Sequence, residues 1–267
     1  MATRTKNAVA AKQTTAVSTV SYEDEVAALA KRLQMNTGDR IKINLSKFFE
    51  FPDGSTETEI EGIVLDFVAH NRYYTSSYNP NSIVPPECFA LGLEPTGLIA
   101  SDNSPDKQCA SCAACWANQF GSAQGGKGKG KACSNTRILA LVIPPKDMAV
   151  DDDLSELPIY TLSVSPTALK AFDGYVGKVA AHFKKPVRTV FTHIGFDPGS
   201  DYPSLRFAAT APAGRELEVY ANSRLEEARQ RLMVEPDVSA ILAANDAKAT
   251  KAPPKRGGAP ARAGARR

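Results

Sequence analysis

Residues 59–69, with the sequence EIEGIVLDFVA, do most to decide the fold. Ile60, Ile63, Leu65 and Phe67 recur at short and nearly alternating intervals, as in a strand that buries one face. Isoleucine, valine and phenylalanine also favour the extended backbone of a packed sheet. We therefore expect a core β-strand here, and we assign the neighbouring segments relative to it.

Several other segments have the same strand-like character. The turn Pro52-Asp-Gly54 separates the first of them from the core strand, and Asp197-Pro-Gly199 separates the last two. The expected strands are 40–49, 136–143, 158–164, 187–195 and 204–210.

Helices are expected over three segments, 22–35, 166–183 and 214–233. The middle one has apolar residues at spacings of three and four, and Ser165 and Pro166 suit its start. Several short strands, few helices and no βαβ alternation predict a mainly β, α+β fold. The expected form is an OB-like small antiparallel barrel with a C-terminal helix.

Charge is spread unevenly over the 267 residues. Residues 1–20 carry three basic and no acidic residues, and 245–267 carry seven basic residues and one acidic residue. Since the whole chain has a net charge of +3, residues 21–244 are left with about −6. We expect two basic disordered tails, 1–20 and 245–267, on either side of a single domain, 21–244.

The segment 70–135 shows no periodicity, so we expect a loop inserted in this domain and held by something other than a hydrophobic core. All five cysteines of the chain lie in it: Cys88, Cys109, Cys112, Cys115 and Cys133. An odd number of cysteines in a chain of intracellular type argues against a disulfide framework and favours a metal site.

The cysteine spacing suits two kinds of metal centre. Cys109-Ala-Ser-Cys112 and Cys112-Ala-Ala-Cys115 are overlapping C-x-x-C knuckles, each of which supplies two thiolates from one tight turn. A structural zinc ion takes four thiolates, so one cysteine is surplus. The alternative is an iron–sulfur cluster held by Cys109, Cys112, Cys115 and Cys133.

A glycine–lysine segment precedes Cys133. Lys127, Lys129 and Lys131 alternate with glycine, but the Ser or Thr that follows the lysine of a phosphate-binding P-loop is missing. We expect a hairpin whose three ammonium groups suit a phosphate backbone.

Over about fifty residues the chain resembles a group of bacteriophage-type proteins in which several short motifs occur in a fixed order. Here these motifs are Pro86-Glu-Cys88-Phe89, Cys112-Ala-Ala-Cys115, Asn118-Gln-Phe120-Gly-Ser122, Gly128-Lys-Gly-Lys131-Ala-Cys133 and a strand with Arg137 near its start. The group is associated with phage replication modules and with zinc-containing single-stranded DNA-binding proteins of OB type.

The resemblance implies zinc ligands at Cys88, Cys112, Cys115 and Cys133, with Cys109 as an alternate ligand or free thiol. It also implies single-stranded DNA and replication proteins as partners. The chain departs from the group in its additional Cys109 and in a basic C-terminal tail, where single-stranded DNA-binding proteins commonly carry an acidic one.

Single-stranded DNA is bound by aromatic rings that stack on bases and by cations that meet phosphates. We expect the tyrosines after residue 72, the lysine hairpin and the metal site to converge on one face. The candidate binding residues are Arg72, Tyr73, Tyr74, Tyr78, Trp116, Phe120, Lys127, Lys129, Lys131 and Arg137.

No catalytic pattern stands out. His70, His182 and His193 are scattered, and no Ser/His/Asp or paired-acid spacing accompanies them. We therefore expect a non-catalytic single-stranded DNA-binding protein of DNA replication and recombination. The alternative is a zinc-stabilised adaptor, or a virion-associated protein, that binds another protein and no nucleic acid.

A membrane span is not expected, because no run of about 18 apolar residues occurs. The expected location is the cytoplasm, which is that of the host cell if the protein is phage-encoded.

Overall fold

The computed structural model describes residues 39–76, 84–123, 129–145 and 157–242. Two compact units are separated at Gly38, and all of the described residues belong to the second, Asp39–Arg267. The expected helix at 22–35 and the expected tails at 1–20 and 245–267 lie outside the described residues.

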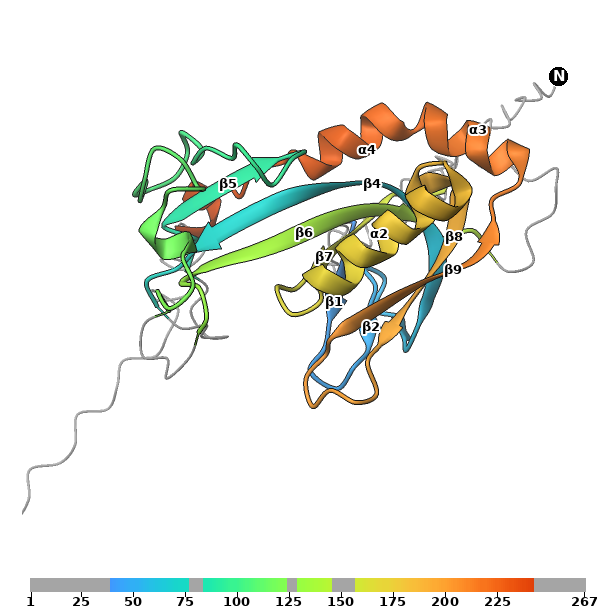
Figure 1. The fold of residues 1–267 in the computed structure, drawn as a ribbon, viewed down its shortest axis with the longest axis horizontal. Coiled ribbons are helices and arrows are strands. Elements are labelled where there is room, and N and C mark those ends of the chain that lie inside the picture. Colours follow the sequence, from blue (N-terminus) through green and yellow to red (C-terminus); the bar gives the residue numbers. More distant parts are fainter. Residues whose placement is uncertain (1–38, 77–83, 124–128, 146–156, 243–267) are drawn as a thin grey trace, which may run out of the picture. The chain divides into compact units, whose positions relative to one another are not determined.

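A nine-stranded sheet forms the centre of this unit (Figure 1). Its main path has the strand order β3-β2-β1-β7-β6-β4-β8-β9, and β5 pairs with β4 off this path. The bounds are β1 Arg40–Ile43, β2 Phe49–Glu50, β3 Thr56–Glu57, β4 Ile60–Tyr73, β5 Cys88–Gly92, β6 Cys133–Val142, β7 Tyr160–Val164, β8 Val190–Phe196 and β9 Leu205–Pro212.

The sheet curls into an open half-barrel of mixed strand direction. The described pairs are antiparallel with one exception, because β1 runs parallel to β7. The predicted α+β class is confirmed. The parallel pair corrects the expectation of a purely antiparallel sheet, and the assignment to an OB-like barrel stays a prediction.

The longest strand, β4, connects the core to the cysteine segment. Its first residues pair with β8, for example Ile60 with Ile194, and residues from Ile63 onward pair with β6. Its last five residues also pair with β5. The core thus continues directly into the sheet that carries Cys88 and Cys133.

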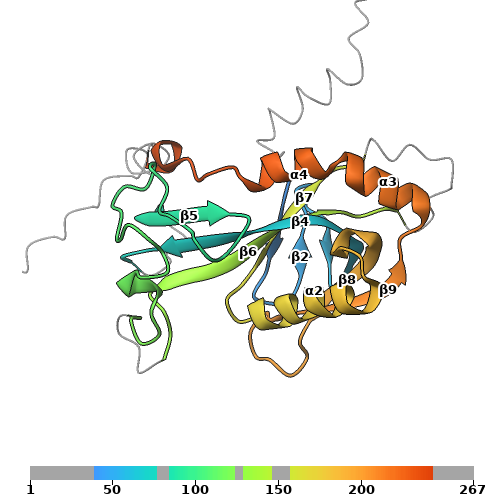
Figure 2. The same cartoon turned by 45° about the horizontal axis from the view of Figure 1, so that its top comes forward.

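One face of the sheet is covered by α2, Leu169–Phe183 (Figures 1 and 2). The helix buries Phe172, Tyr175 and Val179 against apolar strand residues such as Leu139 and Leu162. The Tyr175 hydroxyl shares a hydrogen bond of 2.6 Å with Thr192, so its polar atom is satisfied inside the core.

The opposite face is covered by α3, Arg215–Ser223, and α4, Leu225–Leu232 (Figure 2). Tyr220, Ala228 and Leu232 from these helices pack on Ile63 and Val68 of β4. The sheet is therefore buried between two helical layers along its central part.

Four element predictions need correction. The expected strand 40–49 is two strands, β1 and β2, joined by a turn in which Lys47 has a φ of 62°. The expected loop 70–135 contains the end of β4 and all of β5. The expected helix 214–233 is broken at Arg224, and the helix expected from Pro166 begins at Leu169.

Other short elements agree with their patterns. The expected strands 136–143, 158–164 and 204–210 correspond to β6, β7 and β9. The expected strand 187–195 begins with a 3-10 turn, Val187–Thr189, before β8.

Candidate metal centre and nucleic-acid interface

The site is built at the end of the sheet where three strands meet. Tyr73 of β4 is in register with Cys88 of β5 on one side and with Cys133 of β6 on the other. Residues directly opposite one another in antiparallel strands project from the same face. The register therefore places both cysteines on the face of the sheet that carries Tyr73.

The Cys112–Cys115 turn covers this face. The Cys115 amide donates to the Cys112 carbonyl at 3.4 Å, and the Asn118 side-chain amide donates to the same carbonyl at 2.8 Å. The Cys112 amide donates to the Leu98 carbonyl at 3.0 Å, which ties the turn to the loop after β5. These bonds hold a C-x-x-C knuckle over the sheet.

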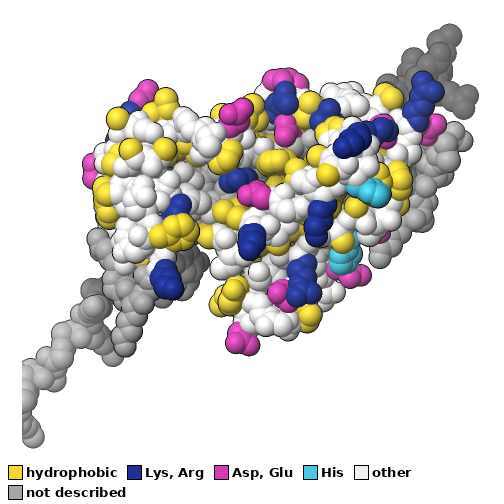
Figure 3. Space-filling view, viewed as in Figure 1, with side chains coloured by type: hydrophobic (Ala, Val, Ile, Leu, Met, Phe, Trp, Pro, Cys, Tyr) yellow, Lys and Arg dark blue, Asp and Glu magenta, His cyan; other side chains and the backbone are white. Residues whose placement is uncertain are grey.

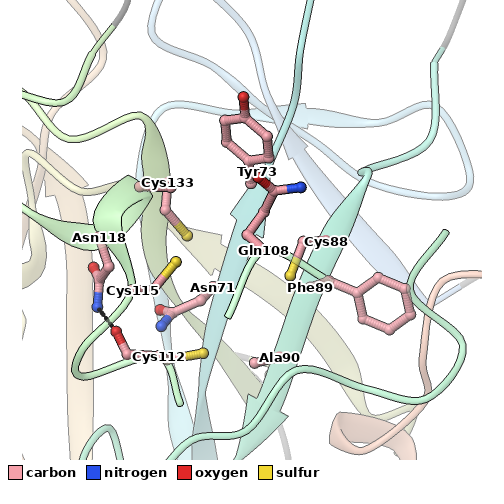
Figure 4. A pocket seen from close by; sticks show the side chains of 11 residues that line it. Asn71, Tyr73, Cys88, Phe89, Ala90, Gln108, Cys112, Cys115, Asn118 and Cys133 are labelled. Atoms are coloured by element: carbon pink, nitrogen blue, oxygen red, sulfur yellow. Dashed lines mark hydrogen bonds between the residues drawn. The ribbon is translucent and has the colours of Figure 1, made fainter. Parts of the chain in front are cut away.

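The sulfur atoms of Cys88, Cys112, Cys115 and Cys133 point into one small cavity (Figure 4). The cavity has a volume of about 20 Å³, and apolar groups together with Asn71, Gln108 and Asn118 complete its lining. The five cysteines are all free thiols. Cys109 is not among the lining residues but lies beside Cys115.

Burial and mutual proximity make these thiols hard to ionise. Burial, with the neighbouring thiols as the next cause, raises the pKa of Cys133 to about 12. Burial also raises the pKa of Cys112 and that of Cys115. Without a cation, the thiols of Cys112, Cys115 and Cys133 are therefore neutral at pH 7.

Zinc fits the donor chemistry of this cavity. Four thiols, from the two strands β5 and β6 and from the knuckle, form the ligand set of a closed structural site. Within the described residues, however, no group of three or more His, Cys, Asp or Glu side chains is arranged so that it could hold a metal ion. Binding would therefore require the thiols to draw together.

Aromatic and basic side chains surround the knuckle. Trp116 follows Cys115 in the 3-10 turn Trp116–Asn118 and is 44% exposed, and Phe120 is 79% exposed. The Lys131 ammonium lies 4.9 Å from the centre of the Phe120 ring and donates to Asn118 Oδ1 at 3.1 Å. In Figure 3 exposed hydrophobic side chains are prominent at this end, on the left, while Lys and Arg are spread over the α2 end.

The remaining predicted binding residues do not all lie together. Tyr73 is buried, with its ring 5.5 Å from that of Trp116. Arg137 is buried on the α2 face, where its guanidinium lies 3.6 Å from Asp173. Lys129 is exposed.

Arg72 and Tyr74 lie away from the knuckle. Side chains alternate along β4, so Arg72 belongs to the sheet face opposite Tyr73. Tyr74 is the first residue after β4 and lies near Arg40, which is on that same opposite face. Tyr78 and Lys127 lie outside the described residues. The structure thus joins Trp116, Phe120, Lys131 and the cysteines, but it does not bring Tyr73 and Tyr74 to one face.

Three polar residues near the site escaped the sequence patterns. Asn71 lies under the knuckle, where its side-chain oxygen Oδ1 accepts a hydrogen bond of 2.7 Å from the Asn135 side-chain amide and its side chain also contacts Cys112. Arg40 and His70 lie near Arg72 on the opposite face. Polar residues at alternate positions beyond Val68 could have indicated His70, whereas no such pattern points to Asn71 or to Arg40.

Compared with known proteins, the chain matches no family model, no curated protein and no solved structure. Among the described helices, none has the length and apolar character needed to cross a membrane.

Proposed function

We propose that this chain is a non-catalytic single-stranded DNA-binding protein of DNA replication and recombination, with an OB-like half-barrel and a structural zinc ion. The observation that carries the proposal is the exposed pair Trp116 and Phe120 beside Lys131, all held by one cysteine knuckle. Exposed rings next to a cation are what base stacking and phosphate contact require.

The zinc ion would be held by Cys88, Cys112, Cys115 and Cys133. Bound there, it would supply a cross-link between β5, β6 and the knuckle and would favour the thiolate form of its ligands. Trp116 and Phe120 lie one and five residues after Cys115, so their positions depend on the knuckle. An iron–sulfur cluster that uses Cys109 is less well supported, because Cys109 lies outside the cavity lining.

The hairpin next to the knuckle supports phosphate contact. The Gly121 amide donates to the Gly130 carbonyl at 2.9 Å, and the Ser122 hydroxyl accepts a bond of 2.9 Å from the Ala132 amide. These bonds fix the segment that carries Lys129 and Lys131 against the turn that carries Phe120. The ammonium groups of Lys129 and Lys131 and the ring of Phe120 are thereby held close together, where one nucleic-acid strand could contact them.

The test is binding of the full chain to a labelled oligodeoxythymidine at two salt concentrations, compared with a duplex of the same length. Trp116→Ala with Phe120→Ala should lower single-strand affinity by tenfold or more, since stacking contributes about 1–3 kcal/mol per base. Tyr202→Ala is the matched control, because Tyr202 is also an exposed aromatic, 53% accessible, but lies in the β8–β9 turn.

The competing function is a zinc-stabilised adaptor that binds another protein. Its support is the exposure of Leu93 at 51% and Ile99 at 68% in the segment after β5. A parent chain that binds no oligonucleotide even at low salt would contradict the single-strand proposal and favour the adaptor.

A further inference from the structure

A second polar site lies on the sheet face opposite the cysteines. It is a groove of about 320 Å³ that crosses β1, β7, β6 and β4, whose positions can be followed in Figure 1. We name it the arginine groove, and its lining includes Arg40, Arg72, Ser134, Thr136, Ser163 and Ser165.

Strand register explains why these side chains share one face. Arg72 is in register with Ser134, His70 with Thr136, and Ile138 with Ser163. Farther along β4, Val68 lies on the same face but is covered by the α4 layer. The arginine groove is therefore the polar continuation of a face that is apolar under α4.

Within the described residues, the two arginines of the arginine groove have no acidic partner. Among the described ion pairs none contains Arg40 or Arg72, whereas Lys42 at the groove's edge pairs with Glu50 at 3.3 Å. The two arginines are close enough that the charge of Arg72, after burial, lowers the pKa of Arg40. Two neighbouring guanidinium groups with no acid between them favour an anionic ligand.

Unpaired polar atoms lie beside these charges. His70 is 6% exposed, and within the described residues neither of its ring nitrogens has a hydrogen-bond partner. The Arg72 Nε is also buried without a partner. Buried donors are ordinarily paired, and Arg72 lines the groove, so its unpaired Nε favours a ligand with an oxygen acceptor there.

An aromatic ring adjoins the two arginines. Tyr74 is 38% exposed, and it lies near enough to Arg40 for its charge to influence that residue's pKa. A ring beside two guanidinium groups suits a nucleotide better than an isolated inorganic anion, since the ring can stack on a base while the arginines hold its phosphate.

We propose that the arginine groove binds the phosphate groups of a single-stranded nucleic-acid backbone, with Tyr74 stacking on an adjacent base. This inference rests on the proposed function and extends it, because it assigns a second contact surface on the far side of β4. A strand that contacts both the knuckle and the arginine groove would pass around the end of the sheet at Tyr73 and Tyr74.

The test replaces Arg40 and Arg72 together by glutamine in the full chain. Affinity for oligodeoxythymidine at low salt should fall tenfold or more, and the slope of log affinity against log salt should fall by about 1.4, or about 0.7 for each lost phosphate contact. Arg188→Gln with Arg206→Gln removes the same charge outside the groove and should leave the slope unchanged. Should the Arg72 variant not fold, Arg40→Gln alone must lower the slope by about 0.7.

A second readout separates this inference from the proposed function. The ring signals of His70, one of three histidines, should shift in NMR spectra when inorganic phosphate is added to the parent, and not in the double variant. If the double variant binds oligonucleotide as tightly as the parent, the groove does not bind the nucleic-acid backbone. The proposed function is unaffected by that result. If phosphate shifts the His70 signals of the parent protein but the parent binds no oligonucleotide, the groove is an anion site. The proposal that the protein binds single strands is then contradicted.

Discussion

Tyr73 and Tyr74 are consecutive residues that lie on opposite faces of the sheet. Tyr73 is 6% exposed and packs against Trp116 beside the cysteines, whereas Tyr74 is 38% exposed and lies near Arg40. The end of β4 therefore separates a structural tyrosine from one that is available to a ligand.

This separation predicts different effects of two neighbouring substitutions. Tyr73→Ala should lower the free energy of unfolding by about 3 kcal/mol or more, because it removes a large ring from a buried cluster. Tyr74→Ala should leave stability within about 0.5 kcal/mol but weaken oligonucleotide binding by about 1–3 kcal/mol. Urea unfolding and fluorescence anisotropy measure the two effects, and equal losses of stability would contradict the assignment.

The cysteine cavity predicts which thiols hold zinc. Cys109→Ser should retain one zinc per chain, whereas Cys88→Ser should lose it, because Cys88 lines the cavity and Cys109 does not. Metal analysis of the purified variants measures this. If the purified unsubstituted protein is brown, absorbs near 400 nm and contains about four irons per chain, the site holds an iron–sulfur cluster and not zinc.

The strands were predictable where the apolar pattern is strong. Ile63, Leu65 and Val68 of β4 are buried as the sequence suggests. The strand β5 was missed because its formation depends on pairing with the end of β4, about twenty residues earlier in the chain. Its position depends on contacts distant in sequence, which local periodicity does not report.

The sequence indicated which cysteines form the site, but not which face of the sheet the neighbouring side chains lie on. Spacing indicated that Cys112 and Cys115 form a knuckle, and the turn is present. The face on which a strand residue lies depends on register, and a shift by one residue reverses it. For this reason the sequence placed Tyr73 beside Tyr74, and it did not indicate that Arg40 and Arg72 meet through the β1–β7–β6–β4 pairing.

A tight contact between strands predicts the effect of adding one methyl group. A Cβ at Gly62 would lie 2.6 Å from the Val142 carbonyl oxygen, which is backbone and cannot move aside. Gly62→Ala should therefore destabilise the fold by about 1–3 kcal/mol. Gly174→Ala in α2 is the control, since no atom lies within 4 Å of its Cβ, and it should stabilise by about 0.4–1 kcal/mol. Thermal unfolding of both variants tests the pair, and similar melting shifts would argue against this packing.

The buried imidazole of His70 predicts an acid sensitivity. Burial first, and then the charges of Arg72 and Arg40, lower the pKa of His70 from 6.5 to about 3. The unfolded chain therefore binds more protons at this residue between about pH 6.5 and 3, so stability is unaffected above that window and falls as the pH falls through it. At pH 5 the loss through His70 should be about 2 kcal/mol relative to pH 7. His70→Gln cannot titrate, so urea unfolding of the variant at pH 7 and pH 5 should lack this part of the parent's loss. Equal losses in the two proteins would show that His70 is protonated in the folded state, and that the two arginines do not hold it neutral.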